Sequence, residues 1–162
     1  MPAPIRAAAP ADTAAIFALA YELAEFEKLT HVFAATEDGL RDALFGARPS
    51  IEALVAESEG RIVGYALFFH NYSSFVGKRG LYLEDVYVQP AARAGGLGTA
   101  LLQHLAAIAV ERQCGRFEWT VLDWNTAAIS FYEKMGATVM PDWRVVRLTG
   151  EALEQLAAGA KV

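Results

Sequence analysis

The strongest constraint on the fold is a glycine-rich turn between a strand-like segment and a helix-like segment. Residues 81–88 are rich in β-branched and aromatic side chains, and Pro90 ends the predicted strand. Three glycines lie within residues 93–99, and apolar residues at helical spacing then predict a helix over about 98–112. Glycines let backbone N–H groups approach an anion closely, and a helix N-terminus supplies unpaired N–H groups. The segment therefore predicts a site for a phosphate or pyrophosphate group.

Arg93, beside these glycines, would add a permanent positive charge for a phosphate. Two familiar phosphate sites do not fit. The sequence has no Gly-Lys-Ser/Thr, which a nucleoside-triphosphate P-loop requires. The dinucleotide fingerprint needs three glycines at fixed offsets in a parallel βαβ unit, and the match is poor. A glycine-rich turn that binds nothing remains the alternative.

The remaining pattern predicts a mixed order of helices and strands. Strands are expected over residues 5–8, 51–57, 61–70, 81–88, 117–122 and 144–148. Helices are expected from the Pro10–Asp12 turn to about Glu27, then over residues 37–45, 98–112, 126–135 and 151–158. Residues 58–60 are predicted as a turn and residues 71–80 as a polar connection. This order predicts an α+β fold with a mixed sheet and a strand-helix-strand crossover.

Composition narrows the class of protein further. The chain has 162 residues with 54% hydrophobic and 20% charged side chains, which predicts a single globular domain over residues 1–162. Its net charge of −5 argues against a nucleic-acid partner, because phosphate backbones attract a cationic face. The single cysteine allows no internal disulfide, which fits a reducing, cytoplasmic location.

The sequence also argues against a membrane segment and a metal site. Charged residues and a proline interrupt the apolar N-terminal region, so neither a signal peptide nor a membrane span is expected. The three histidines do not cluster with acids or with Cys114 at metal-ligand spacing, so no metal is expected. No nucleophile elbow or activated-thiol context is present, so no covalent intermediate on a side chain is expected.

The pattern Arg93-x-x-Gly96-x-Gly98 resembles the acetyl-CoA signature of the GNAT superfamily of N-acetyltransferases. Residues 81–88 and 121–125 are similar to the diamine (spermidine/spermine) acetyltransferase branch, closest to its thialysine N-epsilon-acetyltransferase-like members. Further similarity lies at residues 72–75, 136–137 and 150–152, so the match covers almost the whole chain. The resemblance implies the GNAT fold, with a central, mostly antiparallel mixed sheet flanked by helices. It also implies acetyl-CoA as co-substrate, and relatives of this kind are typically homodimers.

Three positions depart from the family pattern. Ala94 replaces a glycine that is common after the motif arginine, and Ala128 stands where many relatives carry a polar residue. Phe75 replaces a tryptophan that is frequent in this branch. We expect these changes to affect one cofactor hydrogen bond and the shape of the acceptor pocket.

The resemblance implies a base and an acid. An alkyl amine with a pKa near 10.4 is neutral in only about one molecule in a few thousand at pH 7, so attack on a thioester requires a base. Glu84, on the strand before the turn, is implied as that base, directly or through a water. A regular strand would point Glu84 and Asp85 to opposite faces. Tyr132 is implied as the acid that protonates the departing thiolate. The alternatives are a solvent-facing or salt-bridged Glu84 and a core tyrosine.

The same resemblance implies the residues that hold the two substrates. Amides of the strand end would bind the carbonyl oxygen and the pantetheine arm, and Asn125 would bind the coenzyme or cap a helix. Phe131 would line the pantetheine arm or the core, and Lys134 would meet a phosphate or solvent. The expected cofactor residues are Val86, Tyr87, Val88, Arg93, Ala94, Gly95, Gly96, Leu97, Gly98, Thr99, Asn125, Phe131 and Lys134. The expected acceptor residues are Glu27, Tyr72, Ser73, Phe75, Glu84 and Asp85. The other acids of the first helix, Glu22 and Glu25, are interpreted as its solvated face.

The sequence leaves three functions open. The first is acetylation of a small primary amine, either a polyamine or an amino acid such as thialysine or lysine. The second is acetylation of protein N-termini or lysines, which needs an open peptide groove. The third is a non-catalytic acyl-CoA sensor, which would need neither Glu84 nor Tyr132.

Overall fold

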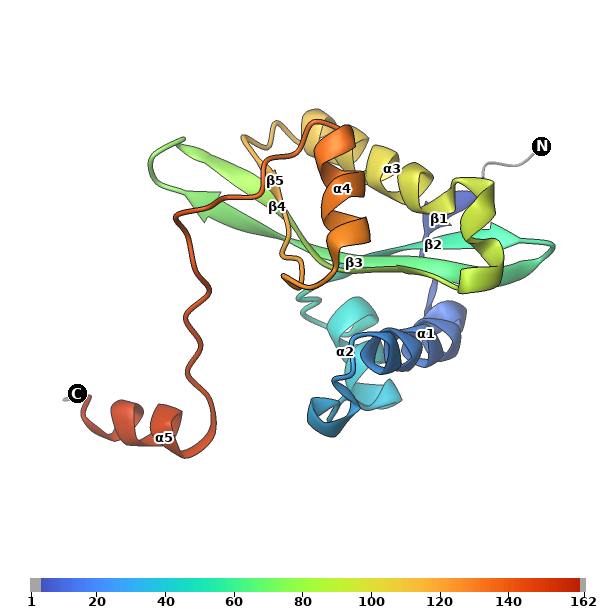
Figure 1. Ribbon diagram of the computed structural model, residues 1–162. Helices are drawn as coiled ribbons and strands as arrows, with labels where there is room; N and C mark the ends of the chain where they lie inside the picture. Colours follow the sequence, from blue (N-terminus) through green and yellow to red (C-terminus); the bar gives the residue numbers. More distant parts are fainter. Residues whose placement is uncertain (1–3, 161–162) are drawn as a thin grey trace. The chain divides into compact units, whose positions relative to one another are not determined.

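The computed structural model describes residues 4–160 and contains two compact units, one up to residue 120 and one from residue 121 onward. The first unit begins with β1 (Ile5–Ala7), η1 (Pro10–Asp12), α1 (Thr13–Phe26), η2 (Thr30–Val32) and α2 (Glu37–Phe45). It continues with β2 (Glu52–Ser58), β3 (Arg61–Ser73), β4 (Lys78–Val88), η3 (Pro90–Gly95), α3 (Leu97–Glu111) and β5 (Phe117–Glu118) (Figure 1).

The described strands form one five-stranded sheet in the order β1-β2-β3-β4-β5. The first three pairs are antiparallel, and β4 pairs with β5 in parallel through Leu81↔Phe117 and Tyr82↔Glu118. The parallel pair arises because α3 carries the chain back along the sheet between β4 and β5. The prediction of a mixed, mostly antiparallel sheet with flanking helices is confirmed.

The helices α1 and α2 cover one face of the sheet, and α3 lies on the other (Figure 1). Tyr65 and Leu67 of β3 and Tyr87 of β4 pack against Ile16 and Leu19 of α1 in the buried core. Burial of each such side chain stabilises the fold by about 1.5–3 kcal/mol. This packing holds the first half of α1 against β3 and the end of β4.

Local signals predicted several boundaries well. The helix α2 spans the predicted residues, and the Thr36 hydroxyl caps it by accepting a hydrogen bond of 3.0 Å from the Gly39 N–H. The β2–β3 turn falls where Glu59 and Gly60 adopt positive φ angles of 51° and 75°. These features depend on neighbouring residues alone, which is why the sequence predicts them.

Two predicted strand boundaries were wrong. The polar segment 71–80 is not an irregular connection, because antiparallel pairing continues to Ser73↔Lys78 and makes a long hairpin. Backbone hydrogen bonds extend this hairpin whatever the polarity of its side chains. The strand predicted over residues 117–122 is only Phe117–Glu118. Its pairing ends at Tyr82, two residues before an irregularity that bends β4.

The second unit contains α4 (Thr126–Lys134) and α5 (Gly150–Ala158). Gly136, at φ 100°, follows the end of α4, as expected for a helix stop. The strand predicted over residues 144–148 is not formed, because these residues make no strand pairing with the described sheet. Across residues 4–160, no helix has the length and apolarity that crossing a membrane requires.

Candidate active site

Glu84 lies at a β-bulge in the pairing of β3 with β4. Phe68 pairs with Leu83 and Leu67 pairs with Asp85, so Glu84 is an extra residue on β4. Consecutive residues of β3 face opposite sides of the sheet, and Leu83 and Asp85 therefore do so as well. The regular alternation expected for this strand does not hold across the bulge. Bulges of this kind redirect side chains next to active sites, and the Glu84 side chain is exposed here.

Asp85 lies on the face of the sheet that α1 covers, with Tyr65 and Glu27. The Tyr65 hydroxyl donates a hydrogen bond of 3.0 Å to Asp85 Oδ2. Burial raises the pKa of Asp85, and the charge of Glu84 raises this pKa further. The pKa of Glu27, at the end of α1, is also raised, by burial and then by the charge of Asp85. The structure therefore brings Glu27, Asp85 and Glu84 close enough for their charges to interact. It also places Tyr65, which was not among the predicted residues, against Asp85.

The end of β4 offers backbone groups on its free edge. Within the described sheet β5 pairs only with Leu81 and Tyr82, so the β4 edge beyond them has no strand partner. On its other edge Val86 pairs with Ala66, and the strand ends at Val88. An extended polar chain could add to this edge as a strand does.

The turn after β4 consists of η3 and a left-handed residue. Gly96, at φ 72° and ψ 16°, is the N-cap of α3, and only glycine adopts this conformation without strain. The backbones of Gly95 and Gly98 do not lie in the left-handed region. A Cβ added at either would meet nothing within 4 Å in the described part of the chain. Neither conformation nor packing requires glycine at these two positions, so they leave open space at the start of α3.

Arg93 points back toward β4 and α1. Its Nε donates a hydrogen bond of 2.9 Å to the Val88 carbonyl oxygen. Its guanidinium carbon lies 5.3 Å from the ring centroid of Phe26 and 5.6 Å from that of Tyr87. These contacts tie the turn to the end of α1 as well as to β4.

Glu22 belongs to the same contact region, and its interpretation as part of a solvated helix face was wrong. It accepts hydrogen bonds from the Tyr87 hydroxyl at 3.2 Å and from Gln89 Nε2 at 3.0 Å. The sequence carried one signal for this position. Glu22 follows the buried Leu19 by three residues, so both lie on the same face of α1. Sequence reasoning missed Tyr65 for a different reason, since a tyrosine in an apolar strand gives no sign of its hydroxyl partner.

The predicted acceptor residues fall into two groups. Tyr72, Ser73 and Phe75 lie at the far end of the β3–β4 hairpin, where Tyr72 and Phe75 are 69% and 95% exposed. At about 3.3 Å per residue, Lys78 at that end and Glu84 are about 20 Å apart along β4. The first unit therefore does not bring the hairpin group next to Glu27, Asp85 and Glu84.

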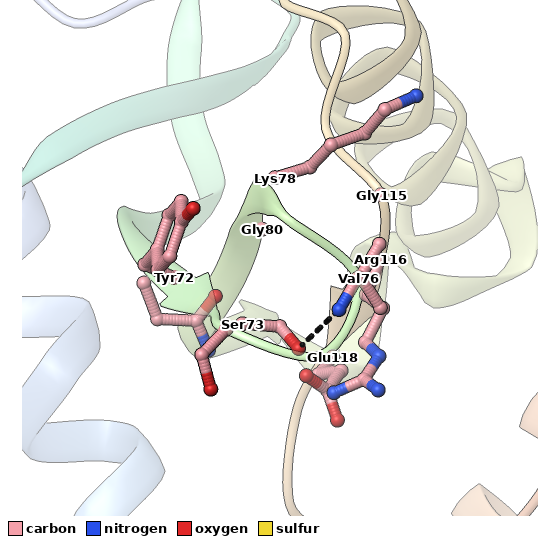
Figure 2. A pocket seen from close by; sticks show the side chains of 10 residues that line it. Tyr72, Ser73, Val76, Lys78, Gly80, Gly115, Arg116 and Glu118 are labelled. Atoms are coloured by element: carbon pink, nitrogen blue, oxygen red, sulfur yellow. Dashed lines mark hydrogen bonds between the residues drawn. The ribbon is translucent and has the colours of Figure 1, made fainter.

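A polar cavity of about 250 Å³ opens beside the hairpin end (Figure 2). Ser73, Lys78, Gly115, Arg116 and Glu118 contribute to its lining, and the Ser73 hydroxyl accepts a hydrogen bond of 3.2 Å from the Val76 N–H. Lysine and arginine stand beside a glutamate in this lining, so the cavity has mixed charge. It lies at the opposite end of β4 from the glycine turn.

The second unit holds the remaining predicted residues on or next to α4. Asn125 is the N-cap, and its Oδ1 accepts a hydrogen bond of 3.2 Å from the Ala128 N–H. The rings of Phe131 and Tyr132 lie 5.6 Å apart between centroids. Lys134 ends the helix. The capping role foreseen as the alternative for Asn125 is therefore present.

The chain matches known proteins over most of its length. The family model described as Acetyltransferase (GNAT) family matches residues 15–137. The thialysine N-epsilon-acetyltransferase of Mus musculus is 40% identical over 164 residues, which cover 94% of this chain and 96% of the relative. The L-ornithine N5-acetyltransferase NATA1 of Arabidopsis thaliana is 36% identical over 197 residues, with 94% and 86% covered. The integron cassette protein VCH_CASS6 of V. cholerae has a similar structure, with a TM-score of 0.79 at 25% identity and with 94% and 96% covered.

The mixed sheet, the bulged β4 and the open glycine turn before α3 belong to the class of acyl-group transferases that the family match indicates. The chain belongs to the Acetyltransferase (GNAT) family and is an N-acetyltransferase. Acetyl-CoA is the co-substrate of this family. The resemblance to thialysine acetyltransferases that the sequence motifs indicated is confirmed.

Proposed function

We propose that the enzyme transfers the acetyl group of acetyl-CoA directly to a small primary amine, either a polyamine or diamine or an amino acid like thialysine or lysine. The relatives named for thialysine and ornithine acetylation support a small acceptor. The observation that supports the binding of acetyl-CoA is the glycine turn. At Gly95 and Gly98, neither the backbone conformation nor contact with other residues requires a glycine. A phosphate group that approaches the backbone closely would explain both glycines.

The donor would lie along the turn and the free edge of β4. The first-turn N–H groups of α3, at Leu97, Gly98 and Thr99, have no intrahelical acceptor and would meet the phosphates, with Ala94 and Arg93 shaping the turn. The amides of Val86, Tyr87 and Val88 would hold the pantetheine arm and the thioester carbonyl oxygen. From α4, we assign Asn125, Phe131 and Lys134 to coenzyme contacts.

The acceptor would approach the acidic residues beside the bulge. Glu84 would remove a proton from the attacking amine, directly or through a water, and Tyr132 would protonate the departing thiolate. Glu27 and Asp85 would bind the cationic acceptor, because both carboxyl groups lie close to another negative charge. Tyr72, Ser73 and Phe75 would contact the acceptor only if it reaches the hairpin end.

We further propose a single catalytic domain that acts in the cytoplasm as a homodimer. The family match supports one domain, because it crosses from the first compact unit into the second. The exposed aromatic side chains Tyr72 and Phe75 suit burial against another protein surface. Light scattering coupled to size-exclusion chromatography tests the dimer, and a monomer at micromolar concentration contradicts it.

The decisive test of the donor site is Gly98→Ala. Alanine favours a helix over glycine by about 1 kcal/mol, so the melting temperature should stay the same or rise. The added methyl group should nevertheless raise the Kd for acetyl-CoA at least about tenfold, measured by calorimetry. The control Gly60→Ala, at φ 75° in the β2–β3 turn, should show the reverse pattern of lower stability and unchanged binding. Unchanged binding in Gly98→Ala would refute the proposed cradle.

The acceptor class is tested by free-thiol release with a panel of amines. Diamines, polyamines, thialysine, L-lysine and L-ornithine form one group, and a lysine-containing peptide with a free N-terminus forms the other. Turnover of the small amines supports the proposal. Turnover of the peptide alone would favour a protein acetyltransferase. Tight binding of acetyl-CoA without turnover of any amine would favour a sensor.

A further inference from the structure

Tyr65 is a buried polar residue that the reaction scheme does not use. It lies in the middle of β3 with no exposed surface, among the apolar side chains that α1 and α2 cover. Its hydroxyl is not left unpaired, because it donates a hydrogen bond of 3.0 Å to Asp85 Oδ2. Asp85 pairs with Leu67, two residues after Tyr65, so both side chains lie on the same face of the sheet.

Filling a core with a Tyr–Asp pair costs more free energy than filling it with apolar side chains. A phenylalanine would bury the same ring without needing a partner, and apolar replacements for both members of a buried pair are often neutral. Burial also raises the pKa of Asp85, which means that the charged carboxylate is disfavoured in this position. Packing alone therefore does not account for the pair.

The surroundings of Asp85 carry further negative charge. Glu84 lies beside it in the bulge, and Asp85 in turn raises the pKa of Glu27. Only the Tyr65 hydroxyl acts in the opposite direction among the described effects on the pKa of Asp85, since a hydrogen bond to the carboxylate favours its charged form. A ligand that brings a positive charge would relieve the repulsion.

We infer that Tyr65 is a positioning residue for acceptor binding: it holds Asp85 Oδ2 so that the rest of this carboxylate, with Glu27, receives the ammonium group of the acceptor that does not react. This inference rests on the proposed function. The reacting nitrogen must be neutral to attack, so it belongs beside the proposed base Glu84. A pair of carboxylates suits the nitrogen that stays protonated. The buried ring of Tyr65 has little freedom, which makes its hydroxyl a rigid donor.

The consequence is a preference for acceptors with two amino groups. An acceptor without the second ammonium leaves the Asp85 and Glu27 carboxylates uncompensated in a partly buried site. It should bind more weakly than its diamino counterpart, although its reacting amine is the same. Tyr65 would then act on specificity through Asp85, without contact with the reacting atoms.

The test compares Tyr65→Phe with wild type on two acceptors, the best of the small amines and its analogue without the second amino group. For 1,5-diaminopentane the analogue is pentylamine, and for L-ornithine it is 5-aminopentanoic acid. Loss of one hydrogen bond to a charged group should raise KM for the diamino acceptor about tenfold. The kcat and the Kd for acetyl-CoA should stay within about twofold, and KM for the analogue should not change.

Three further variants separate positioning from folding. Asp85→Asn with Tyr65 intact should give at least the same KM increase, and the double variant should be no worse than Asp85→Asn alone. Tyr82→Phe, on β4 but against the ring of Phe69, should change neither KM. Equal losses on both acceptors, or an unchanged preference for the diamino acceptor in Tyr65→Phe or Asp85→Asn, would overturn the inference. If wild type turns over no amine at all, the proposed function fails instead.

Discussion

Arg93 closes its own turn, because its Nε donates a hydrogen bond of 2.9 Å to the carbonyl oxygen of Val88, five residues earlier. Its guanidinium also lies over the rings of Phe26 and Tyr87. The arginine of the signature therefore has a structural task in addition to any contact with a phosphate. It links the glycine turn to α1, at whose end Glu27 interacts with Asp85.

Arg93→Lys tests this task. Lysine keeps the positive charge. It has neither the Nε–H that bonds to the Val88 carbonyl oxygen nor the planar guanidinium that lies over the two rings. The Kd for acetyl-CoA should rise about tenfold, as measured by calorimetry. The control Arg41→Lys should have no effect, because Arg41 makes exposed ion pairs at 3.5 Å on α2. Equal affinity in Arg93→Lys and wild type would show that charge alone matters.

Glu84→Gln tests the base. The amide keeps the shape of the side chain at the bulge but cannot accept a proton, so kcat should fall by about 10²–10⁴ in the free-thiol assay. The Kd for acetyl-CoA should not change. Glu59→Gln, at the exposed β2–β3 turn, is the matched control. A kcat within about twofold of wild type would remove Glu84 from the reaction.

Tyr132→Phe tests the acid. Loss of the hydroxyl should lower kcat by about 100-fold with little change in KM, because the proton is needed only as the thiolate leaves. The control Tyr21→Phe removes a hydroxyl from α1, where the ring contacts Phe33. If Tyr132→Phe retains full turnover, protonation of the thiolate must come from elsewhere.

Asp85→Asn should be more stable than wild type at neutral pH although it binds the acceptor less well. Burial raises the pKa of Asp85, so the folded state binds its proton more tightly than the unfolded state. The stability associated with this group is complete at low pH and is lost as pH rises through the raised pKa. Asparagine does not titrate, so the melting temperature of the variant should be a few degrees higher at pH 7.5.

The difference between Asp85→Asn and wild type should shrink as the pH falls through the raised pKa and vanish below about 3, where wild-type Asp85 is protonated in both states. Melting curves by circular dichroism across this pH range measure it. Asp38→Asn is the control, because the Asp38 side chain is 98% exposed. A variant that melts below wild type at pH 7.5 would mean that the hydrogen bond from Tyr65 to the carboxylate outweighs its burial.

Features with a local cause were predictable from the sequence. Thr36 predicts the start of α2, because a hydroxyl there caps the N–H three residues later. The glycine turn and the following helix are equally local, and together they predict a site for an anionic group. The family motif around Arg93 then narrows that group to acetyl-CoA.

The acceptor side could not be predicted in the same way. The bulge at Glu84 exists only as a register shift between β3 and β4, and the contacts of Tyr65 with Asp85 and of Glu22 with Tyr87 join residues far apart in the chain. Side-chain alternation along one strand says nothing about such shifts.

The sequence by itself therefore determined the glycine turn and the family, because backbone conformation and helix capping depend on adjacent residues. The tertiary structure alone decided which carboxylates gather beside β4, and that Tyr72 and Phe75 lie at the other end of the hairpin. The physical reason is that charge interactions and strand register are set by segments that meet only after folding.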